Sequence, residues 1–264
     1  MSSAMSSVRT DPFPVVCAVC RGPLASDLGA CTSCAQRYPR HDAALLDLCV
    51  SEDRINVATE AAYKMYSRFY APIALLVYWI VWRGNFSRHV AFFRGIVDHD
   101  PVVVDVATGE GTLTHLALLK RAKRARRVLG LDISGDMLRK AVKKLPGSDV
   151  VLLRSDVQQL PFPDHSLRAM TCFGGLNSFP SGAVALREMA RVLAPDGRLR
   201  GSVLLLPESR WRANLVRKWI REGYQTEVVT QEILETWVAG AGLVFSQRER
   251  HGDVILFELV LAPS

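Results

Sequence analysis

One stretch, Val102–Leu119, limits the fold of this chain more than any other. It begins as an apolar run with Asp105 near its end and then breaks at a turn that contains Gly109 and Gly111. Residues 113–119 then have the pattern of a helix, so the order predicts a buried strand, a tight loop and a helix. The glycines let a ligand approach the backbone, and the first helical N–H groups can bind negative charge. A nucleotide-binding dehydrogenase has a similar loop, so later segments must decide which ligand it holds.

Two further predicted strands also end in acids. Residues 128–134 form an apolar run that ends at Asp132, whose carboxylate is placed to accept two hydrogen bonds from a ribose diol. Residues 150–154 form another, and Asp156 follows it, where a carboxylate could accept a bond from an adenine amino group. Ordinary turn chemistry is the alternative for each acid taken singly.

The acids are followed by Leu160-Pro161-Phe162-Pro163-Asp164 and by the segment 186–198. From about Tyr63 to Leu261, this pattern resembles the class I S-adenosylmethionine-dependent methyltransferases. Residues 105–109 and 173–179 are most similar to the quinone-ring and related small-molecule members. The resemblance implies an α/β fold, a doubly wound seven-stranded sheet in the order 3-2-1-4-5-7-6 with the last strand antiparallel. It implies S-adenosylmethionine as cofactor, bound by Asp105, Ala107, Thr108, Gly109, Gly111, Asp132, Ile133, Met137, Asp156, Val157, Phe173 and Gly174.

Two Cys-X-X-Cys pairs near the N-terminus bracket a loop of ten residues. The pairs are Cys17 with Cys20 and Cys31 with Cys34, and together they can bring four thiolates around one ion, which is the chemistry of a structural zinc site. Two disulfides are less expected in a reducing compartment, and a redox pair would not need duplication. Four cysteines already complete the site, so His41 is expected to be a surface histidine rather than a ligand.

The cysteine pairs and the following residues 38–47 resemble the small zinc-ribbon proteins that activate methyltransferases. The predicted organisation is a disordered tail over 1–12, a small zinc ribbon over 13–50 and a methyltransferase domain over 51–264. Met1–Arg9 lacks the apolar segment of a signal peptide, so a cytoplasmic location is expected. Cys49 and Cys172 stand alone and are expected to be small buried apolar residues.

Two segments are candidates to cover a substrate or to meet a membrane. Tyr66 and Tyr70 share one helix face and precede the apolar run Ala71–Trp82, which is shorter than the roughly 20 residues that span a bilayer. A buried or substrate-covering helix is predicted there, and an interfacial helix is the alternative. Residues 209–223 form a basic amphipathic helix with Trp211 and Trp219, which either covers the pocket or docks on anionic lipid or phosphate.

The formal net charge of +7 suits nucleic acid, anionic lipid or an acidic partner, and composition does not choose among them. The densest basic run, Lys120–Arg127, is expected to be a solvated helix end. Nucleic-acid contact is the alternative, although no aromatic residues interleave the cations to stack on bases.

Methyl transfer from a sulfonium is an in-line displacement that needs no nucleophilic side chain, so no catalytic residue is assigned. His89, His115 and His165 are candidates for a general base, each with a structural role as the alternative. Asn177 could orient a substrate oxygen or satisfy its own backbone. Arg168 stands where related sequences carry an acid, which leaves the chemistry of that strand edge open.

The predicted acceptor is a hydrophobic small molecule such as a quinone, a prenyl compound or a lipid. The alternative is ribosomal RNA, because some bacterial guanine methyltransferases also fuse an N-terminal four-ligand zinc module to this fold, and residues 109–115 resemble theirs. A domain that binds the cofactor and only scaffolds a partner is the third hypothesis.

Overall fold

The computed structural model describes residues 13–39, 45–49, 76–120, 127–145, 149–223 and 225–263. Predictions for the N-terminal tail, His41, Tyr66, Tyr70, the first part of the run Ala71–Trp82 and most of the run Lys120–Arg127 lie outside these residues. The predicted boundary at residue 50 does so as well.

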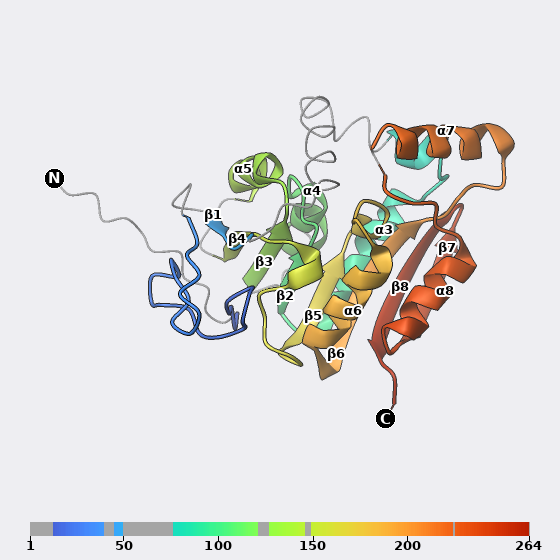
Figure 1. Cartoon of the computed structure of the whole chain (residues 1–264). Helices are drawn as coiled ribbons and strands as arrows, with labels where there is room; N and C mark the ends of the chain where they lie inside the picture. Colours follow the sequence, from blue (N-terminus) through green and yellow to red (C-terminus); the bar gives the residue numbers. More distant parts are fainter. Residues whose placement is uncertain are drawn as a thin grey trace.

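The strands form one mixed sheet in the order β1-β4-β3-β2-β5-β6-β8-β7 (Figure 1). They are β1 Leu45–Asp47, β2 Val102–Val106, β3 Arg127–Asp132, β4 Val150–Arg154, β5 Leu167–Cys172, β6 Leu193–Leu204, β7 Leu243–His251 and β8 Val254–Leu261. Strand β8 pairs antiparallel with β6 and β7, and the other neighbours pair in parallel.

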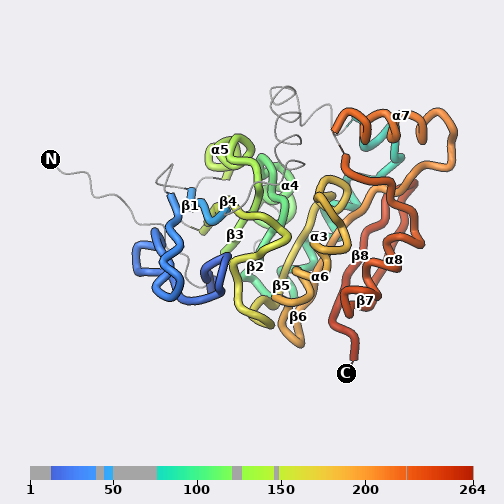
Figure 2. Tube along the Cα trace, in the orientation of Figure 1, coloured from blue at the N-terminus to red at the C-terminus, as the bar shows by residue number. Residues whose placement is uncertain are grey.

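The prediction of seven strands was wrong, because the described residues contribute eight to this sheet. The extra strand is β1, which lies in the predicted ribbon and pairs in parallel with β4, with Leu46 opposite Leu153. Without β1, the order is the predicted 3-2-1-4-5-7-6 with the last strand antiparallel. Figure 2 shows the N-terminal segment beside β4 at one end of the sheet and the C-terminal strands at the other end.

Helices cover both faces of the sheet. They are α3 Phe86–Arg94, α4 Thr112–Thr114, α5 Gly135–Lys144, α6 Gly182–Val192, α7 Arg210–Arg221 and α8 Gln231–Gly240, with short turns η1 Gly95–Asp98, η3 Val157–Gln159 and η4 Gly175–Asn177 and the π-helix η2 His115–Leu119. In Figure 1, α6 and α8 lie in front of the sheet and α3 lies behind it.

The period of two along each strand sends neighbouring side chains to opposite cores. Val103 of β2 packs into the cluster formed with α3 and η2, whereas Val104 packs into the cluster formed with α6 and α8. Both valines are buried, so β2 is covered on both faces, as expected for a central parallel strand. The carboxyl ends of the parallel strands consequently form one exposed edge, where loops can build a site.

Candidate functional site

A cavity lies at the carboxyl ends of β2, β3, β4 and β5. Its walls are largely apolar, with two carboxylates among them. It is lined by Val106, Ala107, Gly109, Leu131, Asp132, Ile133, Ser134, Met137, Ser155, Asp156, Val157, Leu160, Phe173, Gly174, Gly175, Ser178 and Phe179. Polar groups at fixed positions within apolar walls are typical of cofactor sites.

The loop after β2 approaches the cavity through its backbone. Ala107, Gly109 and Gly111 all have positive φ, of 61°, 57° and 79°, which gives the loop its tight bend. A Cβ atom added at Gly109 would meet no protein atom within 4 Å, so the space in front of this residue is open. Glycine here therefore leaves a backbone surface on which a ligand can lie.

Asp105 supports the loop from inside the protein. Its carboxylate is fully buried and accepts hydrogen bonds from the hydroxyls of Thr108 at 2.6 Å, Thr114 at 2.5 Å and Thr171 at 2.7 Å. Burial raises the pKa of Asp105 to about 6, although the three hydroxyl bonds oppose the shift. Asp105 thus ties β2 to the loop, to α4 and to β5.

Asp132 ends β3 and faces the cavity. One of its oxygens accepts a 2.8 Å hydrogen bond from the N–H of Gly109, and the other accepts a 2.9 Å bond from the N–H of Ser134. Asp132 lines the cavity, so a carboxylate with about four lone-pair sites lies within reach of a ligand bound there. Ser134 caps α5 by accepting a bond from the N–H of Met137, which also lines the cavity.

Asp156 follows β4 in the equivalent position. It is 8% exposed, and its carboxylate accepts a 2.9 Å hydrogen bond from the N–H of Gln158 at the start of η3. Asp156 lines the same cavity as the apolar side chains of Ile133 and Val157. A flat aromatic ring with an amino substituent could pack against the apolar side chains and donate from its amino group to the carboxylate.

Most of the predicted cofactor residues line this cavity. The exceptions are Asp105, Thr108 and Gly111, which shape the loop from behind. The predicted cofactor residues did not include eight of the lining residues: Val106, Leu131, Ser134, Ser155, Leu160, Gly175, Ser178 and Phe179. Phe179 belongs to the segment 173–179 that carries the family resemblance, so the sequence did contain a signal that could have identified it as a lining residue.

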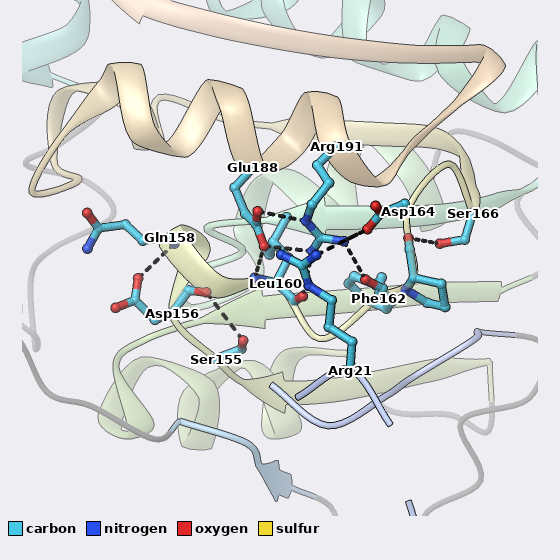
Figure 3. A network of polar contacts seen from close by, with 11 residues as sticks. Arg21, Ser155, Asp156, Gln158, Leu160, Phe162, Asp164, Ser166, Glu188 and Arg191 are labelled. Atoms are coloured by element: carbon cyan, nitrogen blue, oxygen red, sulfur yellow. Dashed lines mark hydrogen bonds and ion pairs between the residues drawn. The ribbon is translucent and has the colours of Figure 1, made fainter. Parts of the chain in front are cut away.

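The loop that contains Leu160 is fixed by α6 (Figure 3). Arg191 donates to the carbonyl oxygens of Leu160 at 3.0 Å and Phe162 at 2.9 Å, and it pairs with Glu188 and Asp164 at 2.6 Å each. Glu188 also accepts a 2.9 Å bond from the N–H of Leu160. The side chains of one helix therefore hold the backbone of one cavity wall.

The two cysteine pairs come together as predicted. The four Sγ atoms of Cys17, Cys20, Cys31 and Cys34 lie within 4.8 Å of one another, with Cys17 and Cys34 at 3.7 Å and Cys20 and Cys31 at 3.4 Å. Four thiolates about 2.3 Å from a tetrahedral zinc ion would be just under 4 Å apart, so this donor set fits zinc.

The surroundings of the sulfur atoms also fit a metal site. Backbone N–H groups of Gly22 and Ser33 donate to Cys20 and Cys31 at 3.4 and 3.3 Å. Each pair is followed by a residue with positive φ, Arg21 at 59° and Ala35 at 58°, so the two turns have the same bend. This repeat is what two matching knuckles around one ion require.

Tyr38 stabilises the thiolate form of Cys17. Its hydroxyl accepts a bond from the N–H of Ala18 at 3.0 Å and lies 3.0 Å from the Sγ of Cys17, to which it can donate. Burial acts to raise the pKa of Cys17, but the bonds from Tyr38 and from the backbone outweigh it and lower this pKa to about 6. Metal ligation requires the thiolate, so this environment favours it.

The cysteine segment packs directly against the loop and strands that line the cavity. Val16 donates through its N–H to the carbonyl of Pro161 at 2.9 Å, and Leu48 does so to Arg154 at 2.9 Å. The buried side chains of Cys17 and Tyr38 belong to the same hydrophobic cluster as Phe162. Figure 3 shows Arg21 reaching Asp164, at 3.5 Å, beside Arg191.

The histidine candidates are spread across the fold. His89 is buried in α3, with its Nδ1 2.9 Å from the hydroxyl of Tyr78 and its ring stacked on Phe93. His115 starts the π-helix η2, and His165 precedes β5 at the amino edge of the sheet, opposite the cavity. None of the three lines the cavity.

Asn177 and Arg168 have structural partners. The amide of Asn177 donates to the carbonyl of Leu204 at 2.8 Å and accepts from its N–H at 2.9 Å, so this side chain binds the backbone of β6 rather than its own backbone. Arg168 pairs with Asp196 at 2.8 Å and with Asp100 at 3.8 Å, near the amino edge of β5.

Comparison with known proteins identifies the domain that holds the cavity. The family described as "Methyltransferase domain" matches residues 103–197, which include the loop after β2, Asp132 and Asp156. Residues 103–197 are thus similar to a methyltransferase domain. The match covers the central strands and ends at residue 197, within β6, so the cysteine segment, α7 and α8 lie outside it.

Sequence relatives of this region include proteins named demethylmenaquinone methyltransferases. The demethylmenaquinone methyltransferase of Bacillus licheniformis is 30% identical over 149 residues, which cover 56% of this chain and 61% of that protein. The chain spans between about 44% and 61% of the length of the curated relatives of this name that it matches, such as those of Lactobacillus johnsonii, Bacillus licheniformis and Thermus thermophilus.

Solved structures show the same fold at lower identity. The YcgJ protein from Bacillus subtilis superposes with a TM-score of 0.54 at 16% identity and covers 67% of this chain and all of that one. A chain of the Haloferax volcanii complex of the Trm112 methyltransferase activator gives a TM-score of 0.54 at 17% identity, over 81% of this chain and all of that one. The fold is therefore the class I methyltransferase fold with an additional N-terminal strand.

Proposed function

We propose that this chain transfers a methyl group from S-adenosylmethionine to a hydrophobic small molecule with a quinone-type ring. The observation that supports it most directly is the cavity within residues 103–197, where an open glycine backbone and two carboxylates lie at three successive strand ends. This arrangement suits a nucleoside with a charged tail: a diol at Asp132, an aromatic base near Asp156 and a tail beside Gly109.

S-adenosylmethionine would supply a methyl group already activated on a sulfonium. The residues of this chain would bind it, fix its orientation and keep water away from it. Proximity and orientation can contribute on the order of 7–11 kcal/mol to such a displacement. Leu131, Met137 and Leu160 are buried members of the cavity wall, and they provide the water-excluding surface.

An aromatic wall next to the cavity supports the proposed acceptor. Phe173 lines the cavity. The centroid of its ring lies 3.8 Å from the ring centroid of Phe93 and 6.0 Å from that of His89. Tyr78 closes the cluster through its bond to His89. A conjugated ring can stack on Phe173, which lines the cavity and is backed by the buried rings of Phe93 and His89. The relatives named demethylmenaquinone methyltransferases support the same class of acceptor.

We also propose that the four cysteines bind one structural zinc ion. The support is the mutual spacing of the Sγ atoms, the repeated turn geometry and the N–H bonds to sulfur. The ion would hold the segment that supplies β1 and that contacts Pro161. In this way it would support the wall that contains Leu160.

The test is methyl transfer with full-length protein and labelled S-adenosylmethionine. Prenylated naphthoquinols and benzoquinols that lack a ring methyl serve as acceptors, and ribosomal RNA serves as the competing acceptor. The expected result is label that partitions into the organic phase and that Asp132→Ala abolishes. Asp136→Ala is the matched control, because this carboxylate lies in the first turn of α5 and bonds to Arg139 rather than lining the cavity. Label found only in RNA would overturn the proposed acceptor, and failure to bind S-adenosylmethionine would overturn the proposed reaction.

A further inference from the structure

Four apolar side chains are exposed together at one corner of the molecule. Leu76 is 54% exposed, Trp79 68%, Ile80 45% and Trp211 60%, and these are most of the large hydrophobic side chains that the described residues expose. We call these four residues the tryptophan patch. A groove joins three of them, and it is lined by Trp79, Ile80, Arg83, Ser209, Trp211 and Arg212.

Specific contacts hold the two segments of the patch together. The buried guanidinium of Arg212 donates to the carbonyl of Val81 at 2.7 Å and pairs with Asp253. Trp82 is buried, and its indole N–H donates to the carbonyl of Leu205 at 3.2 Å. The exposed tryptophans therefore stand on a rigid base, and their exposure is a feature of the fold.

The surface around the patch is positive. Helix α7, RWRANLVRKWIR, contains five cations and no acid. In the described part of the chain, no carboxylate forms an ion pair with the exposed Arg210, Arg217 or Arg221. Arg83 is exposed beside the groove as well. This free positive charge next to exposed indoles matches a surface that is apolar inside and negative at its rim.

The patch lies at the same edge of the sheet as the cavity. Strand β6 ends at Leu204 and α7 begins at Arg210, so the start of α7 lies at the carboxyl edge of the parallel strands. The cavity opens at the same edge, and Figure 1 shows α7 at the upper margin of the molecule. A surface that binds α7 would therefore face the edge of the sheet at which the cavity lies.

We infer that the tryptophan patch and the cations of α7 dock this protein on the surface of an anionic lipid bilayer. Tryptophan favours the boundary between headgroups and acyl chains, and each nearby Lys or Arg adds attraction to anionic lipid. No helix in the described ranges is long and apolar enough to cross a membrane. The inference does not depend on which acceptor is methylated.

The test is sedimentation of full-length protein with vesicles of phosphatidylcholine, with and without phosphatidylglycerol. Wild-type protein is expected to bind the anionic vesicles and to bind them less as salt is added. Trp79→Ser with Trp211→Ser should weaken binding by at least about tenfold through the loss of inserted apolar surface. Arg217→Gln with Arg221→Gln should weaken it on the order of fivefold per cation and flatten the salt dependence.

The matched control is Val244→Ser, which removes an exposed apolar side chain from β7, outside the patch. It should leave vesicle binding unchanged. Brominated lipids should also quench the tryptophan fluorescence of the wild type. They should not quench the fluorescence of the tryptophans that remain in the double variant. Equal vesicle binding by wild type and the double tryptophan variant, or none by the wild type, would overturn the inference. So would a structured RNA that displaces the vesicles and whose binding needs the same residues.

Discussion

The backbone N–H of Gly109 donates a 2.8 Å hydrogen bond to the carboxylate of Asp132. This bond joins the loop after β2 to the end of β3, so the two halves of the cavity hold each other in place. Asp132 therefore has two roles. Its side chain is proposed to bind the ribose, and it also positions the glycine loop.

Asp132→Ala is expected to reduce the affinity for S-adenosylmethionine by at least about 100-fold, since two charge-assisted bonds of about 1.5–3 kcal/mol each are lost. Calorimetric titration measures the effect, and Asp136→Ala should bind as wild type does. Asp132→Asn keeps one acceptor oxygen and should fall between the two. Binding of the alanine variant within a few-fold of wild type would remove Asp132 from the site.

Gly109→Ala is expected to lower cofactor affinity more than stability. The added Cβ would meet no protein atom within 4 Å and would project into the space left for the ligand. Its φ of 57° costs an alanine about 1–2 kcal/mol. Gly242→Ala is the matched control, because Gly242 also has a positive φ, of 69°, and no atom within 4 Å, but lies between α8 and β7. The two variants should melt alike, and only Gly109→Ala should lose binding.

Asp105 should make stability fall as the pH rises from about 4 to about 6. Burial raises its pKa from 3.8 to about 6 in the folded protein, so the folded state binds the proton more tightly than the unfolded state. The stabilisation is complete below the unfolded pKa and is lost through the folded pKa, a change of about 2–3 kcal/mol. Urea unfolding across this range should show the slope in wild type. The difference in unfolding free energy between wild type and Asp105→Asn isolates the contribution of Asp105. If the two proteins changed in parallel with pH, the raised pKa of Asp105 would be contradicted.

Cys20→Ser should release the metal from the cysteine cluster. Structural zinc contributes roughly 10–16 kcal/mol of apparent binding free energy in small peptides, so losing one of four ligands should unfold the cysteine segment while the sheet survives. Elemental analysis of purified protein should give about one zinc per wild-type chain. Cys49→Ser is the control, because Cys49 lies outside the cluster. A wild-type protein without zinc, with four freely reactive thiols, would refute the site.

Arg154 should couple the N-terminal segment to the cavity. Its Nη1 pairs with the buried carboxylate of Asp47 at 3.1 Å, and its Nε donates to the carbonyl of Ile133, a cavity residue, at 2.8 Å. Arg154→Met removes the guanidinium and should cost about 3–5 kcal/mol of unfolding free energy. Adding Asp47→Asn should restore part of that loss. Additive costs in this double-mutant cycle, measured by urea unfolding, would show that the pair is not coupled.

The central strands and the loop could be predicted because their signal is local. Apolar runs that end in Asp132 and near Asp156 specify buried parallel strands wherever they stand, and Gly109 marks the turn without knowledge of its neighbours. Asp105 was predicted to bind the cofactor but does not line the cavity. Its role depends on which hydroxyls fold back onto it, and these come from Thr108, Thr114 and Thr171, the last of them 66 residues away.

The eighth strand and the π-helix could not be predicted, because one depends on contacts with distant residues and the other on a single backbone hydrogen bond. Three apolar and acidic residues at 45–47 have no periodic signal that names β4 as their partner, and the pairing becomes favourable only when Leu46 and Leu48 enter the core with Phe162. Residues 115–119 were predicted as ordinary helix. The bond from the N–H of Lys120 to the carbonyl of His115, at 2.6 Å, widens that turn, and propensity scales do not distinguish the two forms.

The parallel pairing of β1 with β4 sets the order in which this protein can be completed during synthesis. Asp47 and Arg154 are 107 residues apart, so at roughly 5–20 residues per second β1 leaves the ribosome some 5–20 seconds before its partner strand. The cysteine turns are local and can close during that interval. Strand β1 therefore waits for β4, and until β4 is made the edge of β1 has no partner strand from its own sheet and is open to pairing with another chain.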